Sequence, residues 1–181
     1  MRHEEMVKIS FRIDPERSGG MVGETLWAER VGADRFRLAS IPFFVRGVSY
    51  RDVVFGRPGR YGVLTFRGVS IRGGHSTCRM FVGVDLKSAV FRERWAELHG
   101  LGCGYEGAGG HTLALDIPPE ADLDTVLGML EAGAAAGLWE YEMAHCGHPV
   151  GERGGPTPAA RGEQDAPAAR ARRRPPGGLD G

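Results

Sequence analysis

The sequence predicts an α+β fold, in which residues 1–74 form a strand-rich unit and residues 75–150 combine strands with two helices. Two observations lead to this prediction. Apolar and polar residues alternate through much of the first stretch, and this period of two is typical of half-buried strands. The second stretch adds two segments whose apolar residues recur every three or four positions, as in amphipathic helices. From residue 151 onward the chain is rich in Gly, Pro, Ala and Arg, with Leu179 as its one large apolar residue.

The first unit is expected to contain several short strands and no helix. Alternation runs from Val7 to Ile13, and a second strand is expected over residues 22–29 with Trp27 in the core. Further strands are expected over residues 36–38, 52–55 and 61–71, with turns at residues 32–34 and 56–59. Short strands with a turn every ~8–12 residues favour a small β-barrel or a curled antiparallel sheet.

The second unit is expected to begin with a strand and to place a helix after each of two capping residues. Ser88 and Asp122 have side chains that can accept hydrogen bonds from the first turn of a helix. Strands are expected over residues 77–84, 103–106, 112–117 and 139–143. The resulting order, β-α-β-β-α-β, is that of ferredoxin-like domains, in which two helices cover one face of the sheet.

Residues 151–181 are expected to form a disordered tail. They cannot bury enough apolar surface to offset the conformational entropy that folding would cost. Arg170 and Arg172–Arg174 form a basic cluster in this tail. Such a run is usually solvated, and it can also contact an acidic surface or nucleic acid.

Charge separates the two units, although the formal net charge of the chain is zero. Residues 1–74 carry +5, residues 75–150 carry −7 and residues 151–181 carry +2. The chain as a whole therefore lacks the basic character of a nucleic-acid-binding protein. The acidic unit favours a protein partner with a basic surface, such as a nuclease or a toxin.

The cytoplasm is the expected location. The first residues include Glu4 and Glu5, whereas a signal peptide needs a basic start followed by an apolar run. The longest apolar stretch, residues 126–139, is interrupted by Glu131 and glycines and is shorter than the roughly 20 residues of a membrane-spanning helix. No membrane contact is expected, and the sequence indicates no oligomeric state.

Several strings spread over residues 8–149 resemble those of one family. They are Leu26-Trp27-Ala28-Glu29, Ile41-Pro42-Phe43-Phe44, Arg46-Gly47-Val48 with Asp52-Val53-Val54, Gly74-His75-Ser76-Thr77, Leu101-Gly102-Cys103 with Tyr105-Glu106, and Trp139-Glu140-Tyr141-Glu142 with Gly147-His148. On these strings the chain is similar to an uncharacterised bacterial family, domain of unknown function 4265. The resemblance implies no reaction, cofactor or catalytic residue. Cys78 stands where that family is expected to have Tyr or a similar residue, so Cys78 is a poor candidate for a shared function.

Two motifs suggest a bound cofactor or metal, and neither is complete. Residues 102–107 spell G-x-G-x-x-G, but a dinucleotide site needs a strand before the glycines and a helix after them, and the reverse order is expected here. His145, Cys146 and His148, with Cys103 or His111, could ligate zinc, yet the chain has no C-x-x-C pair. We therefore expect no cofactor and no metal, and we expect the three cysteines to be free thiols.

An enzyme remains a second interpretation. His75 and Ser76 are adjacent, so on a strand their side chains point to opposite faces and cannot easily form a pair. A catalytic site, if present, would lie in a cleft between the units and would draw on a small set of titratable residues. This set contains His75, Cys103, Glu106, His111 and His148.

Binding without catalysis is the leading interpretation, because no complete catalytic constellation is visible. The sheet face opposite the helices would carry the binding residues Arg79, Phe81, Asp116, Glu140 and Glu142. That face has one aromatic residue and three acids, so RNA binding there is disfavoured. The alternative for this face is that Arg79 pairs with its acidic neighbours and the first unit covers it.

A third interpretation is nucleic-acid binding by the first unit. Its arginines and aromatic residues are interleaved, as on barrels that bind single strands. They are Arg46, Arg51, Arg57, Arg60, Arg67 and Arg72, with Phe43, Phe44 and Tyr50. The aromatic residues can equally belong to the core, so nucleic acid is a less favoured partner than protein.

Overall fold

A computed structural model describes residues 5–15, 20–59, 62–107 and 110–149 of the chain. Residues 1–149 belong to one compact unit. The tail that was predicted to be disordered, residues 151–181, lies outside the described residues, as does Arg60.

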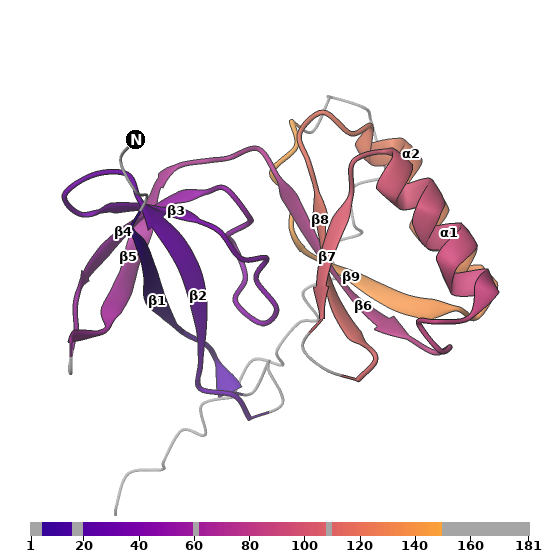
Figure 1. Ribbon diagram of the computed structural model, residues 1–181, viewed down its shortest axis with the longest axis horizontal. Coiled ribbons are helices and arrows are strands. Elements are labelled where there is room, and N and C mark those ends of the chain that lie inside the picture. Colours follow the sequence, from indigo (N-terminus) through magenta and orange to yellow (C-terminus); the bar gives the residue numbers. More distant parts are fainter. Residues whose placement is uncertain (1–4, 16–19, 60–61, 108–109, 150–181) are drawn as a thin grey trace, which may run out of the picture. The chain divides into compact units, whose positions relative to one another are not determined.

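The first sheet contains five strands and closes on itself into a ring in the order β1-β2-β3-β4-β5 (Figure 1). The strands are β1 (Met6–Arg12), β2 (Gly23–Arg30), β3 (Arg35–Leu38), β4 (Val53–Pro58) and β5 (Leu64–Ile71). Consecutive strands pair antiparallel, whereas β1 pairs with β5 in parallel, with Ile9 opposite Leu64. The parallel pair follows from the odd number of strands, since direction alternates along a meander and the first and fifth strands run the same way. We call β1–β5 the ring.

Alternate residues of the ring strands point inward and form its core. Phe11 stacks on Phe66 with ring centroids 4.7 Å apart. The buried residues of this core are Ile9, Phe11, Leu26, Ala28, Phe36, Leu38, Val48 and Val54.

The prediction that Trp27 anchors this core is wrong. Leu26 and Ala28 are buried, so the period of two places Trp27 on the outer surface, where it is 46% exposed. There the Lys8 ammonium lies 4.6 Å from the centre of a Trp27 ring. The strand itself is confirmed, and the smaller Leu26 and Ala28, rather than the larger Trp27, fill the core.

The turn predicted at residues 56–59 begins too early. Gly56 and Arg57 lie within β4 and pair with Phe66 and Thr65 of β5. A Cβ atom at Gly56 would lie 2.8 Å from the Phe36 ring, so glycine lets β4 pass close over that ring. Gly56 therefore serves packing within the strand.

The second sheet has four strands, in the order β7-β8-β6-β9, and all of its pairs are antiparallel. The elements follow along the chain as β6 (Ser76–Val82), α1 (Ala89–Gly100), β7 (Gly104–Gly107), β8 (Thr112–Ile117), α2 (Leu123–Ala135) and β9 (Trp139–His145). This is the expected succession of strands and helices.

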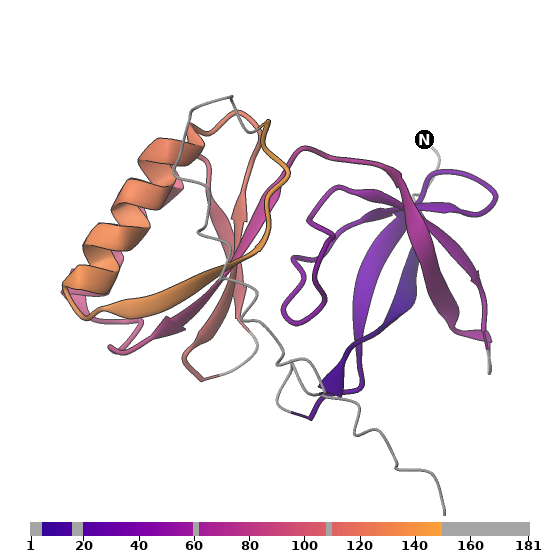
Figure 2. The same cartoon turned by 180° about the vertical axis from the view of Figure 1, so that it is seen from behind.

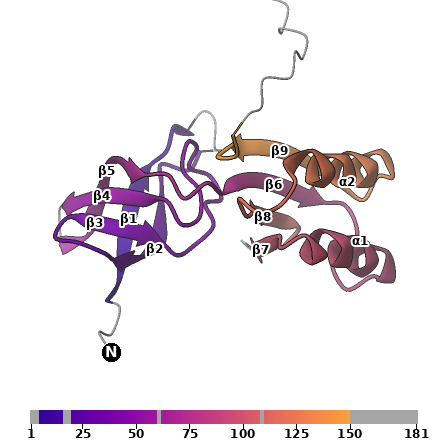
Figure 3. The ribbon, with the colours of Figure 1, turned by 90° about the horizontal axis from the view of Figure 1, so that it is seen from above.

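Both helices begin at the predicted capping residues. The Ser88 hydroxyl accepts a hydrogen bond from the Phe91 amide at 3.3 Å, and the Asp122 carboxylate accepts one from the Thr125 amide at 2.8 Å. Both helices lie on the same face of the sheet (Figure 3). Within the described residues, no helix is long and apolar enough to cross a membrane.

The core of the second sheet lies between its strands and the two helices. Helix α2 leads into β9, and the two elements contact each other (Figure 2). There the Trp139 indole donates a hydrogen bond to the Leu130 carbonyl at 2.9 Å, and its ring packs against Gly133. Met80, Leu113 and Leu115 cover this core from the sheet side.

Candidate functional site

The sheet face opposite the helices, where binding residues were expected, is largely covered. Thr77, Arg79, Ala114 and Asp116 on this face are at most 7% exposed. Groups from the loop between β3 and β4 make contact with it. The Ser49 and Thr77 hydroxyls are 2.8 Å apart, and the Ile41 amide donates to Glu106 Oε1 at 3.1 Å. The first unit therefore covers the central part of this face, as one of the two expected alternatives stated.

Two arginines share one carboxylate at this face. Arg46 Nη2 lies 2.8 Å from Glu142 Oε2, and Arg79 Nε lies 2.9 Å from Glu142 Oε1. Arg79 forms an ion pair with Glu142, but the geometry is not that of a hydrogen bond. Arg79 Nη2 also has no hydrogen-bond partner among the described residues. Burial lowers the pKa of Arg79, and Glu142 opposes this effect. The Glu142 carboxylate is therefore occupied by internal cations.

His75 and Asp116 form a shielded pair at the start of β6. His75 Nδ1 lies 2.9 Å and 3.0 Å from the two Asp116 carboxylate oxygens, and the Tyr50 ring meets the His75 ring edge-on at 5.4 Å. The two side chains are 14% and 10% exposed. A carboxylate on Nδ1 fixes the imidazole orientation, which is the arrangement of a histidine base and its orienting acid.

Ser76 and His148 form a second pair that sequence spacing did not reveal. Ser76 Oγ lies 2.7 Å from His148 Nδ1, and His148 Nε2 lies 3.0 Å from the Pro118 carbonyl oxygen. If Nε2 carries the proton and donates to that carbonyl, Nδ1 accepts from the serine hydroxyl, as in a serine nucleophile with its base.

This serine is enclosed. Ser76 is 0% exposed, and its oxygen also accepts a hydrogen bond from the Gly147 amide at 2.9 Å. A substrate cannot reach such an oxygen, so the pair ties the segment after β9 to β6.

The predicted catalytic residues do not converge on one point. His75 precedes β6, whereas the His111 carbonyl accepts from the Val82 amide at the other end of that strand. At 3.3 Å per residue these ends are roughly 20 Å apart. Glu106 bonds the Ile41 amide, and burial raises its pKa.

The two buried thiols are poor nucleophiles. Burial raises the pKa of Cys78 to about 12 and that of Cys103 to about 11, so both are protonated near neutrality. Cys146 is exposed, and all three cysteines are free. In the part of the chain that is described, no three His, Cys, Asp or Glu side chains are grouped as a metal site would require.

Glu24 is a structurally central residue that sequence reasoning missed. Its carboxylate accepts hydrogen bonds from three consecutive amides, those of Phe43, Phe44 and Val45, at 2.8–3.0 Å. It thereby fixes the loop that covers the sheet face. The sequence shows only an acid within a predicted strand, and its partial burial is visible only in the structure.

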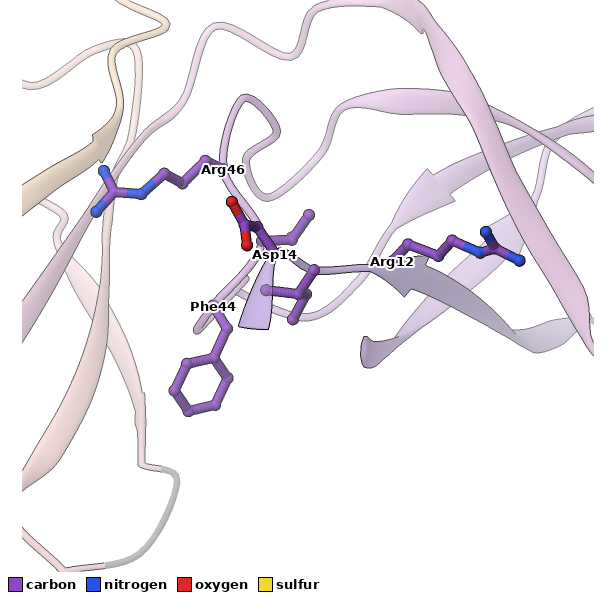
Figure 4. A pocket seen from close by; sticks show the side chains of 6 residues that line it. Arg12, Asp14, Phe44 and Arg46 are labelled. Atoms are coloured by element: carbon purple, nitrogen blue, oxygen red, sulfur yellow. The ribbon is translucent and has the colours of Figure 1, made fainter. Parts of the chain in front are cut away.

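A pocket of about 240 Å³ lies on the ring between the end of β1 and this loop (Figure 4). Arg12, Asp14, Phe44 and Arg46 are among the residues that line it. The guanidinium groups of Arg12 and Arg46 point away from each other (Figure 4). The two cations therefore do not converge on a shared ligand position.

A second pocket, of about 420 Å³, lies at the end of β6. It is lined by Phe81, Val82, Gly83, Ala134, Gly137, Trp139 and Glu140. Phe81 is 46% exposed, and Glu140 is exposed without an ion pair to any described residue. These two are the accessible members of the predicted binding set, since Arg79 and Asp116 are buried and Glu142 is paired.

Three comparisons place the chain among known proteins. It is similar to a solved structure described as "Novel crystal structure of a hypothetical protein from Neisseria gonorrhoeae", with a TM-score of 0.67, 19% identity, and coverage of 82% of this chain and 100% of that chain. At that identity the likeness shows the fold alone. No curated protein sequence matches the chain. A family model described as "Domain of unknown function (DUF4265)" matches residues 24–141.

Proposed function

From the premise that the chain belongs to the family Domain of unknown function (DUF4265), as its sequence strings predicted, we propose that it is a non-catalytic binding protein. Its partner is a protein that presents a basic extended segment. In this proposal, residues 1–74 form a ring unit and residues 75–149 form a ferredoxin-like unit. The second unit binds the partner. The cytoplasm is the proposed location.

The pocket beside Phe81 and Glu140 carries this proposal. Phe81, which is 46% exposed, supplies apolar surface, and the exposed Glu140 carboxylate forms no ion pair with a described cation. A lysine or arginine side chain has an apolar stem and a charged end, so it can place its stem on Phe81 and its charge near Glu140.

Helix α2 adds to the negative potential of the pocket. Its C-terminal end supplies Ala134 and Gly137 to the lining, and its last turn contains no basic residue. A helix C-terminus carries about half a negative charge, which attracts a cation. The surrounding residues 75–149 have a formal net charge of −7, which increases the rate of encounter with a basic partner.

The internal use of the other reactive side chains supports binding over catalysis. His75 bonds Asp116, His148 bonds Ser76, and Glu106 bonds the Ile41 amide. The His75–Asp116 pair is the observation that favours the second candidate, a small enzyme with a site between the two units. That candidate requires an accessible reacting group beside His75, and the described neighbour Asp116 is buried.

Affinity capture with matched variants tests the binding function. The full chain is immobilised and exposed to a cell extract at low salt. We expect it to retain a specific protein that neither the F81A variant nor the E140K variant retains. Two controls on the exposed surface of α1 also truncate an apolar side chain to alanine and replace a glutamate by lysine, and we expect both, V90A and E93K, to retain the partner. Retention is expected to fall steeply with salt, because the attraction between charges is screened.

Three outcomes would contradict binding at this pocket. Equal capture by all five proteins, or capture that salt does not change, would place the partner elsewhere or remove it. Loss of capture with E93K as with E140K would point to general charge attraction rather than to the pocket.

A further inference from the structure

The outer surface of the ring carries a basic strip that is separate from the acidic half. Strands β3, β4 and β5 lie side by side (Figure 3) and contain no aspartate or glutamate. Arg35, Arg57 and Arg67 are exposed, and none of them forms an ion pair with a described residue. We call these three arginines, with Phe55 between them in the sheet, the basic strip.

Most of the other described cations of the ring and its loop form ion pairs, whereas Lys8 lies over the Trp27 ring and Arg12 lines the pocket at the end of β1. Arg30 pairs with Glu5, Arg37 and Arg51 pair with Glu29, Arg46 pairs with Glu142, and Arg72 pairs with Asp52. The aromatic residues that the sequence suggested for nucleic acid, Phe43, Phe44 and Tyr50, are only partly exposed. On strands β3, β4 and β5, the described arginines without an ion pair are therefore those of the basic strip.

Phe55 gives the basic strip an exposed aromatic face. It is 36% exposed, and its cross-strand partners are Arg35 on β3 and Gly68 on β5. Directly opposed residues of antiparallel strands point to the same face of the sheet. A Cβ atom at Gly68 would meet nothing within 4 Å, so the space beside Phe55 is open on that side.

We propose that the basic strip binds single-stranded nucleic acid, with Phe55 stacking on a base and Arg35, Arg57 and Arg67 contacting phosphates. An aromatic platform flanked by cations on a β-sheet surface is the usual means of holding a single strand, because every base has a face that can stack. A duplex keeps its bases stacked inside and offers only phosphates to such a surface. An acidic peptide would pair with the arginines but has no planar group for Phe55.

Fluorescence polarisation with the full chain tests this site. The probes are labelled oligonucleotides of about 12 uridines and of about 12 thymidines, with a duplex of equal length for comparison. We expect both single strands to bind at about 50 mM salt, with a slope of log affinity against log salt of about −2, from three phosphate contacts at about −0.7 each. The ratio of the two affinities shows whether RNA or DNA is preferred.

Three variants locate the binding. F55A is expected to weaken it about tenfold, within the range that loss of one stacked base produces. R57Q/R67Q is expected to weaken it and to reduce the salt slope by about 1.4, because two contacts are lost. R92Q/R94Q removes two exposed arginines from α1 and is expected to leave the affinity unchanged. Because R57Q/R67Q changes only exposed side chains, the site can be tested even if F55A is unstable.

Several results would overturn the proposal. One is equal affinity for the duplex and the single strands, and another is displacement of the oligonucleotide by polyglutamate at equal charge concentration. A third is a tail variant, R170Q/R172Q/R173Q/R174Q, that abolishes binding while F55A and R57Q/R67Q bind normally.

Discussion

Gly133 is the residue whose replacement the packing of the second sheet tolerates least. A Cβ atom there would overlap the Trp139 ring, and that indole is fixed by its hydrogen bond to the Leu130 carbonyl. We expect G133A to lower the free energy of unfolding by about 3 kcal/mol, because a fixed ring cannot yield to an added methyl group. For a chain of this size, the melting temperature should fall by roughly 6–12 °C.

Gly128 in the same helix supplies the matched control. It is exposed, and a Cβ atom there would meet nothing within 4 Å. G128A should raise stability by about 0.5–1 kcal/mol, because alanine loses less conformational entropy in a helix. Thermal unfolding followed by circular dichroism measures both changes, and a G133A protein as stable as G128A would refute the tight fit against Trp139.

Sequence reasoning at the residue scale succeeded where local chemistry decides and failed where tertiary contacts decide. Ser88 and Asp122 were identified as helix caps because a cap depends on three or four neighbouring residues. Trp27 was assigned to the core, although its strand turns it outward. The Ser76–His148 pair joins residues 72 positions apart, so no spacing rule could predict it.

The loop between β3 and β4 depends on one strand residue. Glu24 of β2 accepts hydrogen bonds from the amides of Phe43, Phe44 and Val45. Bonds to a charged acceptor contribute more than neutral ones, so we expect E24A to lower the free energy of unfolding by about 2–3 kcal/mol. Hydrogen exchange at these three amides should accelerate, since they lose their acceptor.

A second acid on the same strand separates this role from a loss of charge. Glu29 forms ion pairs with Arg37 and Arg51, whose side chains are 40% and 41% exposed. The Glu29 side chain itself is 15% exposed, and its two ion pairs are long, at 3.3 Å and 3.4 Å. E29A should therefore lower the free energy of unfolding by about 1 kcal/mol, less than E24A, because it removes long contacts to partly exposed arginines rather than bonds to three amides. If urea unfolding showed equal losses for E24A and E29A, the three amide bonds would not be what stabilises the loop.

The elements themselves were more predictable than their site. Alternation and capping indicated all four strands and both helices of the second sheet, with ends within a few residues of those observed. The predicted set of binding residues included Arg79 and Asp116, which are buried on the face that the β3–β4 loop contacts through Ser49 and Ile41. The β3–β4 loop decides how much of this sheet face stays open, and Glu24 fixes that loop. The alternation of apolar residues carries no information about the contact between Glu24 and the loop.

At the scale of the whole molecule, His145 at the end of β9 faces groups that come from the ring side of the chain. Arg72 Nη1 lies 3.4 Å from His145 Nε2, and Arg72 also pairs with Asp52. Burial lowers the pKa of His145 below its usual 6.5, and the Arg72 charge lowers it further, whereas Asp52 opposes both. The neutral imidazole is therefore the form that the folded chain prefers.

The direction of the pH effect follows from this depressed pKa. Above pH 6.5 the histidine is neutral in both the folded and the unfolded chain, and its contribution to stability is fully present. As the pH falls from 6.5 through the lower folded pKa, the unfolded chain takes up the proton first, and that contribution is lost. Because His145 is partly exposed, the loss should stay below about 1 kcal/mol.

Replacement of His145 isolates this effect from the other titrating groups. We expect H145Q to be less sensitive than the native chain when the melting temperature is measured between about pH 7.5 and 5.5, because glutamine has no proton to gain. H111Q, which removes an exposed histidine from the far end of the second sheet, is expected to keep the native pH dependence. If the melting temperatures of the native, H145Q and H111Q proteins changed equally with pH over this range, the Arg72–His145 contact would not couple protonation to folding.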